Sequence, residues 1–435
     1  MRGITKTVAA VAAVATLGAG AARAETGFNA EVSGVTLTQR ENTRIVDIGY
    51  TLTGEPAIIT LAIETNGVAI PDSAVTRLSG AVSTVIQPGT YTIIWNAGAD
   101  WPEHEVTNAR ARVTAWSTNA PPLYCAVDVA GGPAADNYPV YYYTSAEAVP
   151  GGVTNDLYKT FRILMRKIPP TGGEGFMMGS PSNETGRDAM REDCHNVKLT
   201  KAFYAGVYEI TQSQWYQVMN SWPSKWSNND YKLTRPVDQV SWNDIRGGVW
   251  PGVPRGSGLP GAESFVAKLR ARAAMPGLDL PTDAQWEYAC RAGTSGALND
   301  GTVNITNTDS DARMDLVGRY QYNGGKVLNN GTWSDPPRDC TTANATATVG
   351  SYAPNTWGLY DMHGNLWEWC LDWLVDHLGT GSVEDPVGPD SGSVRVIRGG
   401  SWGSTATGCR SAYRRWNDPS TEFSGYGFRL VRTLP

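Results

Sequence analysis

Residues 357–369 read WGLYDMHGNLWEW, and two further short runs follow, RGGSW at 398–402 and GFR at 427–429. Glycine and tryptophan recur in these runs, and the whole chain holds 48 glycines and 16 tryptophans. Glycine favours turns, and tryptophan supplies large buried anchors. The composition therefore predicts a loop-rich fold that is fixed by aromatic side chains, rather than a helical bundle.

Further motifs extend this pattern toward the N-terminus in a fixed order. The most specific of them is LPTDAQWEYACR at 280–291. Together with the runs above, the set resembles the formylglycine-generating (sulfatase-modifying factor) family over residues 159–432. That resemblance implies an α+β fold of the C-type-lectin-like kind. The other matching motifs are FMMGS at 176–180, REDCHNV at 191–197, YEIT at 208–211, RPV at 235–237, VSWND at 240–244 and VGS at 349–351.

The preceding part of the chain has a different pattern. Residues 25–120 alternate short strand-like runs with turn signals, for example at 44–52 and 109–116. This spacing is typical of a small antiparallel β-sandwich of immunoglobulin or fibronectin type. Residues 121–158 are rich in proline, glycine and alanine and are predicted to be a linker. Residues 159–435 then form the domain that carries the family motifs.

Two helices are expected inside the larger domain. One follows Thr211 and covers residues 212–219, where apolar residues recur at helical spacing. The other covers residues 284–291, with Thr282 as its N-cap. The rest of the domain is expected to consist of short strands and long loops.

The first 24 residues have the features of a secretory signal. Arg2 and Lys6 supply the positive start, an alanine-rich apolar run follows, and small residues end it at Ala24. No later segment has 18 consecutive apolar residues, so no membrane span is expected. The net charge of −6 and the pI near 5.4 argue against a nucleic-acid partner. We therefore expect an exported protein, in the periplasm, on the cell surface or outside the cell.

One motif suggests a metal site. By resemblance, Asp361, Gly364, Leu366 and Glu368 match the calcium motif of the family. Two carboxylates and two backbone carbonyls within eight residues suit a hard cation that prefers oxygen ligands. Such a Ca²⁺ ion would be structural. In the alternative interpretation, Asp361 caps a turn and Glu368 pairs with an arginine.

Cys409 is the residue on which the chemistry depends. The oxidases of the family carry two cysteines five residues apart after the Gly-Gly-Ser run and use them to bind copper. Here the window 403–409 contains Cys409 alone, and an ungapped alignment places Ser404 at the other position. A single thiol cannot supply the two thiolates of a linear Cu(I) site. The family also bridges the position of Cys290 to this segment, so the alternative is a Cys290–Cys409 disulfide.

The resemblance also implies a groove beside this cysteine. Ser401, Trp367 and Arg414 match residues that line the active groove of the family, and with Cys409 they are the candidate catalytic residues. In the alternative interpretation, Trp367 packs in the core. A polypeptide or surface ligand is the expected occupant of the groove near residues 401–409.

Two functions from different classes remain open. By resemblance, the chain is a protein-modifying oxidase that converts cysteine to formylglycine. The alternative is a non-catalytic, lectin-like binding or display protein, including a variable protein diversified by a retroelement. The segments 403–408 and 420–426 are rich in small polar residues and aromatic residues, which suit adaptable surface recognition. A third interpretation is a structural exported protein that has lost the catalytic activity of the family, and the sequence does not distinguish it from a binding protein.

Overall fold

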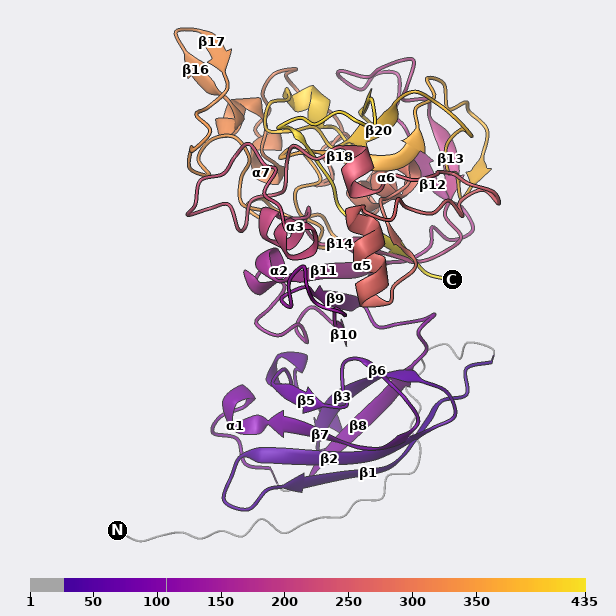
Figure 1. The fold of residues 1–435 in the computed structure, drawn as a ribbon, viewed down its shortest axis with the longest axis vertical. Helices are drawn as coiled ribbons and strands as arrows, with labels where there is room; N and C mark the ends of the chain where they lie inside the picture. The colour runs from indigo at the N-terminus through magenta and orange to yellow at the C-terminus, as the bar shows by residue number, and fades with distance from the viewer. Residues whose placement is uncertain (1–26, 107) are drawn as a thin grey trace. The chain divides into compact units, whose positions relative to one another are not determined.

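The computed structural model describes residues 27–106 and 108–435, so the predicted signal at 1–24 lies outside the described residues (Figure 1). The chain divides into two compact units. Of the described residues, one unit contains 27–106, 108–125 and 140–155, and the other contains 126–139 and 156–435. Within the described stretches, no helix is both long and apolar enough to cross a bilayer.

The first unit is an antiparallel β-sandwich. Its elements are β1 (Glu31–Gln39), β2 (Ile45–Thr53), β3 (Ala57–Thr65), β4 (Val68–Ala69), η1 (Asp72–Ala74), β5 (Leu78–Gly80), β6 (Val85–Ile86), β7 (Gly89–Asn96), α1 (Ala97–Asp100), β8 (Ala109–Trp116) and β10 (Val140–Tyr143). One sheet has the order β1-β2-β7-β5, and in the other β3 pairs with β4, β6 and β8. Along β2 every second residue is buried, because successive side chains point to opposite faces. Apolar side chains from both sheets form one core, as the alternation in the sequence predicts.

The segment predicted to be a linker contains regular secondary structure and buried residues. Residues 121–158 include β9 (Tyr124–Asp128), β10 and the first residues of α2 (Leu157–Thr160). Ala126, Val127 and Val129 are fully buried, so this segment contributes to a core despite its proline and glycine content. The apolar run YCAV at 124–127 was the signal for a strand.

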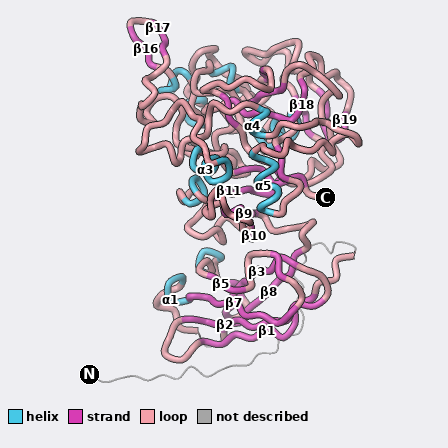
Figure 2. The backbone as a smooth tube through the Cα atoms, viewed as in Figure 1, coloured by secondary structure: helices cyan, strands magenta, loops and turns pink. Residues whose placement is uncertain are grey.

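The second unit is a mixed α+β structure in which loops predominate, as Figure 2 shows. One sheet places β9, β11 (Arg162–Ile168), β14 (Phe203–Gly206), β23 (Val431–Thr433) and β15 (Leu278–Asp279) side by side in that order. A second sheet has the order β21 (Arg414–Asn417), β20 (Arg395–Arg398), β18 (Trp367–Trp373) and β22 (Tyr426–Gly427). The remaining strands are β12 (Phe176–Met178), β13 (His195–Lys198) and β19 (Val383–Glu384) in one small sheet, and the hairpin of β16 (Val327–Asn329) and β17 (Thr332–Ser334).

Both predicted helices are present. α3 covers Gln212–Met219 with Thr211 as its N-cap, and α6 covers Asp283–Arg291 with Thr282 as its N-cap; each forms a capping box. The other helical elements are α4 (Trp242–Ile245), α5 (Phe265–Ala273), α7 (Met314–Val317), the π-helix η2 (Gln321–Gly325) and the 3-10 helix η3 (Ala406–Cys409).

α6 is tied to the second sheet by buried charges. Arg398 of β20 pairs with both Asp283 and Glu287 of α6, and Arg414 of β21 also pairs with Asp283. Burial alone would raise the pKa of Asp283, but the guanidinium groups of Arg398 and Arg414 hold it below its ordinary value. These ion pairs hold α6 against one face of the sheet.

Candidate functional site

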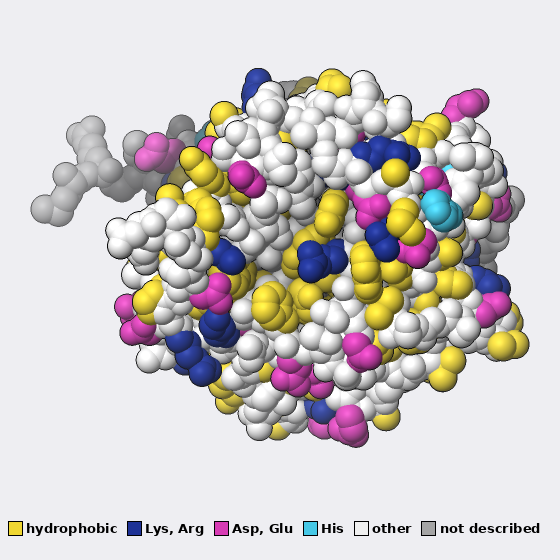
Figure 3. All heavy atoms as spheres, turned by 90° about the horizontal axis from the view of Figure 1, so that it is seen from above, with side chains coloured by type: hydrophobic (Ala, Val, Ile, Leu, Met, Phe, Trp, Pro, Cys, Tyr) yellow, Lys and Arg dark blue, Asp and Glu magenta, His cyan; other side chains and the backbone are white. Residues whose placement is uncertain are grey.

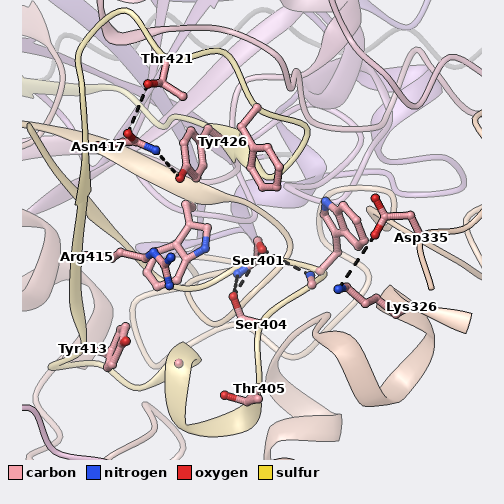
Figure 4. Close-up of a pocket in the computed structure, with 15 residues that line it drawn as sticks. Lys326, Asp335, Ser401, Ser404, Thr405, Tyr413, Arg415, Asn417, Thr421 and Tyr426 are labelled. Carbon is pink, nitrogen blue, oxygen red and sulfur yellow. Dashed lines mark hydrogen bonds and ion pairs between the residues drawn. The ribbon is translucent and has the colours of Figure 1, made fainter. Parts of the chain in front are cut away.

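A groove of about 570 Å³ lies beside this second sheet (Figure 4). Strand, loop and hairpin-flanking residues all contribute to its walls. The lining residues are Lys326, Asp335, Trp367, Ser401, Trp402, Gly403, Ser404, Thr405, Gly408, Tyr413, Arg415, Asn417, Thr421, Phe423 and Tyr426. The space-filling view in Figure 3 shows hydrophobic side chains gathered around basic ones near the middle of one face of the molecule.

Strand β21 decides which side chains enter the groove. Arg415 and Asn417 of this strand line it, at the spacing of two residues that places side chains on one face of a strand, and Tyr413 directly before the strand also lines it. Arg414 is buried on the opposite face, where its Nε lies 2.8 Å from Asp283 Oδ2. The prediction that Arg414 lines the groove is therefore wrong by one residue, and Arg415 occupies that position.

Two serines form a polar part of the groove. Ser401 Oγ lies 3.3 Å from Ser404 Oγ, and the backbone N–H of Ser401 donates to Ser404 Oγ at 3.0 Å. Trp402, directly after Ser401, is 2% exposed and donates its indole N–H to the carbonyl of Ser424. Ser401 thus faces the groove, while Trp402 mainly anchors the loop.

Trp367 has both a packing and a groove role. It is only 5% exposed, yet it lines the groove, and its ring centre lies 5.9 Å from that of Tyr413. Its backbone N–H donates to the carbonyl of Gly425 at 2.8 Å, which joins β18 to the loop before β22. Ser401 and Trp367, two of the four candidate catalytic residues, thus both line the groove, and their catalytic role stays a prediction.

Cys409 is buried and does not line the groove. Its side chain packs with an apolar cluster that includes Leu298 and Met314, and η3 presents Gly408 to the groove instead. Burial raises the pKa of the Cys409 thiol well above its ordinary value, which keeps it protonated. A side chain at Gly400, which has φ 80°, would collide with the Cys409 sulfur, so this glycine is required for the close contact.

The Cys290–Cys409 disulfide implied by the resemblance is not formed in this structure, in which Cys290 and Cys409 are both free thiols. Cys290 Sγ instead lies 3.7 Å from Ser411 Oγ and 3.8 Å from His363 Nε2. The other ring nitrogen of His363 lies 2.7 Å from the carbonyl oxygen of Cys409. Burial lowers the pKa of His363 to about 4, so this ring is a neutral packing element. Ser411, not Cys409, is the neighbour of Cys290 in the C-terminal segment.

The four residues of the calcium motif lie in a loop before β18 and at its start. Glu368 is not available as a simple ligand, since its oxygens accept hydrogen bonds from Arg429 and from the indole of Trp286. Asp361 is different: Oδ2 accepts from the backbone N–H of Gly350, and the buried Oδ1 has no partner. The alternative interpretation of Glu368 is thus correct, while Asp361 retains an oxygen that suits a cation.

Glu209 joins this acidic cluster, and sequence reasoning missed it. Its oxygens accept from the backbone N–H of Leu366 and the side chain of Asn365. Burial, followed by the charges of Asp361 and Glu368, raises the pKa of Glu209 well above its ordinary value. Burial raises the pKa of Asp361 to about 6. Among the described residues, no group of three or more His, Cys, Asp or Glu side chains is arranged to hold a metal by itself.

The groove residues that sequence reasoning missed are mostly in β21 and in the loop before β22. Arg415 and Asn417 could have been found from the alternation along the run RRWN, had its register been known. Phe423 and Tyr426 come from a segment recognised as rich in polar and aromatic residues, without individual roles.

Comparisons with known proteins agree with this architecture. The family model described as "Sulfatase-modifying factor enzyme 1-like domain" matches residues 169–434, and the chain belongs to this family. That membership supports the predicted α+β, C-type-lectin-like fold of the second unit.

Individual relatives carry different names. A serine/threonine-protein kinase pkn1 of Chlamydia pneumoniae is 30% identical over 62% of this chain and 38% of its own length. A formylglycine-generating enzyme of Thermomonospora curvata is 36% identical over 45% of this chain and 55% of its own length. The chain thus spans less than two thirds of either relative. Among solved structures, Treponema denticola variable protein 1 is 26% identical, with a TM-score of 0.46, over 63% of this chain and 96% of its own.

Proposed function

We propose that the second unit binds a polypeptide or surface ligand in the groove and does not perform the copper-dependent oxidation of its relatives. One observation carries the proposal: the described lining of the groove offers hydroxyl, aromatic and charged side chains but no thiol. Copper(I) selects soft thiolate ligands. Cys409 is sealed away and protonated, and Ser404 offers a hydroxyl, so the donors do not fit copper.

The test of the oxidase half uses a peptide substrate. The full chain is incubated with Cu(I), oxygen and a peptide that carries the cysteine motif of sulfatases, and the peptide mass is followed. We expect no change of mass at the peptide cysteine. Conversion of that cysteine to formylglycine would refute this half of the proposal.

The binding half is tested with a displayed random heptapeptide library. Ser404→Trp would fill the groove, whereas Ser182→Trp places the same side chain at an exposed position outside the lining. We expect peptides that are captured by the wild-type chain and by the Ser182 variant but not by the Ser404 variant. Failure to select any peptide sensitive to the Ser404 change would refute ligand binding in the groove.

Calcium is proposed as a structural ion near Asp361. The supporting observations are the partnerless buried Oδ1 and the crowding of Glu209, Asp361 and Glu368 around the single guanidinium of Arg429. Asp361 would hold the ion together with backbone oxygens of Gly364 and Leu366, and the ion would offset the buried negative charge.

We expect added Ca²⁺ to raise the Tm of the second unit relative to EDTA. At a concentration 100 times the Kd, the gain is about 2.7 kcal/mol. Asp361→Asn should abolish the difference between the two conditions, whereas Glu174→Gln, at an exposed carboxylate, should leave it intact. Equal Tm values of the wild-type chain in Ca²⁺ and EDTA would contradict the proposal.

Export is proposed from the composition of residues 1–24. N-terminal sequencing of the protein recovered from its native cells should begin at residue 25. Recovery of the intact N-terminus would contradict cleavage of a signal.

A further inference from the structure

Arg415 is the cation of the groove that lacks an acidic partner. Its side chain is exposed, and its guanidinium carbon lies 6.0 Å from the centre of the Trp367 ring. Arg414, its neighbour in sequence, pairs with Asp283 at the opposite face of the sheet. In the part of the chain that the structure describes, no carboxylate lies within ion-pair distance of Arg415. A guanidinium without an acidic partner, next to an aromatic ring, can donate several N–H hydrogen bonds to an anionic group of a ligand.

The residues on the opposite side of the groove do not neutralise the positive charge of Arg415. Lys326 and Asp335 lie across the Ser401–Ser404 pair from Arg415, as Figure 4 shows. Asp335 is the carboxylate of the lining, and it is shared between Lys225 at 3.1 Å and Lys326 at 4.0 Å. The lining thus holds two cations and one carboxylate that is already paired, in a chain whose net charge is −6. The charge of the groove is opposite to that of the whole chain.

Aromatic rings supply the apolar part of the groove. Phe423 is 48% exposed, and its ring centre lies 5.0 Å from that of Tyr426. Trp367 and Tyr413 form a second pair of rings next to Arg415. Phe423 is the exposed ring of these four, and its surface gains free energy when an apolar group covers it.

We infer that the groove recognises an acidic peptide in an extended conformation, in which an aspartate or glutamate carboxylate binds Arg415 and a neighbouring apolar side chain covers the aromatic rings. This inference rests on the proposed ligand-binding function. Arg415 and Asn417 of β21, and Tyr413 directly before the strand, follow one another at two-residue spacing, and an extended peptide presents its own alternate side chains at the same spacing. A peptide therefore matches the lining along its length, whereas a single anionic sugar ring matches only one of these positions.

The test measures binding of two amidated, acetylated tetrapeptides by calorimetry with the full chain. One peptide is Gly-Phe-Asp-Gly, and the other has asparagine in place of aspartate, so the two differ by a single charge. We expect the aspartate peptide to bind the wild-type chain about tenfold more tightly, as a charge-assisted hydrogen bond allows. Arg415→Gln should remove that preference, and Arg415→Lys should retain part of it. Arg338→Gln, at an exposed arginine outside the lining, should leave it unchanged.

The outcomes separate this inference from the proposed function. Equal binding of both peptides, unaffected by Arg415→Gln, would overturn the acidic preference while groove binding stands. Library peptides that depend on Ser404 but lack acidic residues would do the same. Binding of glucuronate that depends on Arg415, without binding of the aspartate peptide, would overturn the assignment to peptides. If the library yields no peptide whose binding depends on Ser404, the proposed binding function itself is refuted.

Discussion

Replacing Arg398 by methionine should destabilise the second unit by about 3–5 kcal/mol, because the change removes the buried guanidinium that Asp283 and Glu287 share and leaves each carboxylate with a single arginine partner. Arg398 is fully buried, and its Nε lies 2.5 Å from Asp283 Oδ1. The same guanidinium pairs with Glu287 and donates to the carbonyls of Ser411 and Tyr413 at 3.0 Å each. Methionine conserves much of the volume, so the loss reports the charge and its hydrogen bonds. Urea denaturation at pH 7, followed by tryptophan fluorescence, measures the change.

Arg255→Met is the matched control for this prediction. Arg255 also pairs with a carboxylate, Asp390, but the two side chains are 51% and 76% exposed. Exposed pairs contribute about 0–1 kcal/mol, because water already solvates both charges. A loss at Arg398 no larger than the loss at Arg255 would mean that the buried network does not hold α6 to the sheet.

Local chemistry explains which parts of the fold could be predicted from the sequence. The helices after Thr211 and Thr282 were predictable because a threonine cap and a glutamine three residues later satisfy the first backbone N–H groups within one turn. The sandwich strands were predictable because alternation of buried residues is also a local signal. Both signals act over a few residues and require no knowledge of distant contacts.

The groove depends on contacts that the sequence does not display. The register of β21 decides whether Arg414 or Arg415 faces the ligand, and a shift of one residue exchanges them. Likewise, the distance of Cys409 from RGGSW along the chain does not reveal that η3 turns its sulfur beneath Gly400. Asp361 and Glu368 lie close enough in sequence to be considered together, but Glu209, 152 residues before Asp361 in the printed sequence, joins their cluster only after folding.

The same reasoning predicts where a disulfide would form. Ser411→Cys should create a bridge to Cys290, because Ser411 Oγ already lies 3.7 Å from Cys290 Sγ in a fully buried site. A cysteine sulfur extends farther from its Cβ than a serine oxygen, which brings the two atoms toward the bonding distance of about 2.05 Å. The closed loop spans 121 residues in sequence separation. In the chain-entropy model such a loop stabilises the folded state by about 4–5 kcal/mol, with any strain subtracted.

Mass mapping after alkylation under denaturing, non-reducing conditions detects the bridge, and urea denaturation with and without reductant measures its effect. The Cys290→Ala, Ser411→Cys double variant is the control, since it carries the new thiol without its partner. Cys409 provides an internal comparison: it lies two residues from Ser411 in the chain, yet its thiol packs in a different cluster. The new cysteine should therefore pair with Cys290 and leave Cys409 open to alkylation. A disulfide that involves Cys409 in the wild-type chain would instead mean that the segment 406–411 folds differently and that the Cys409 thiol is not buried in its apolar cluster.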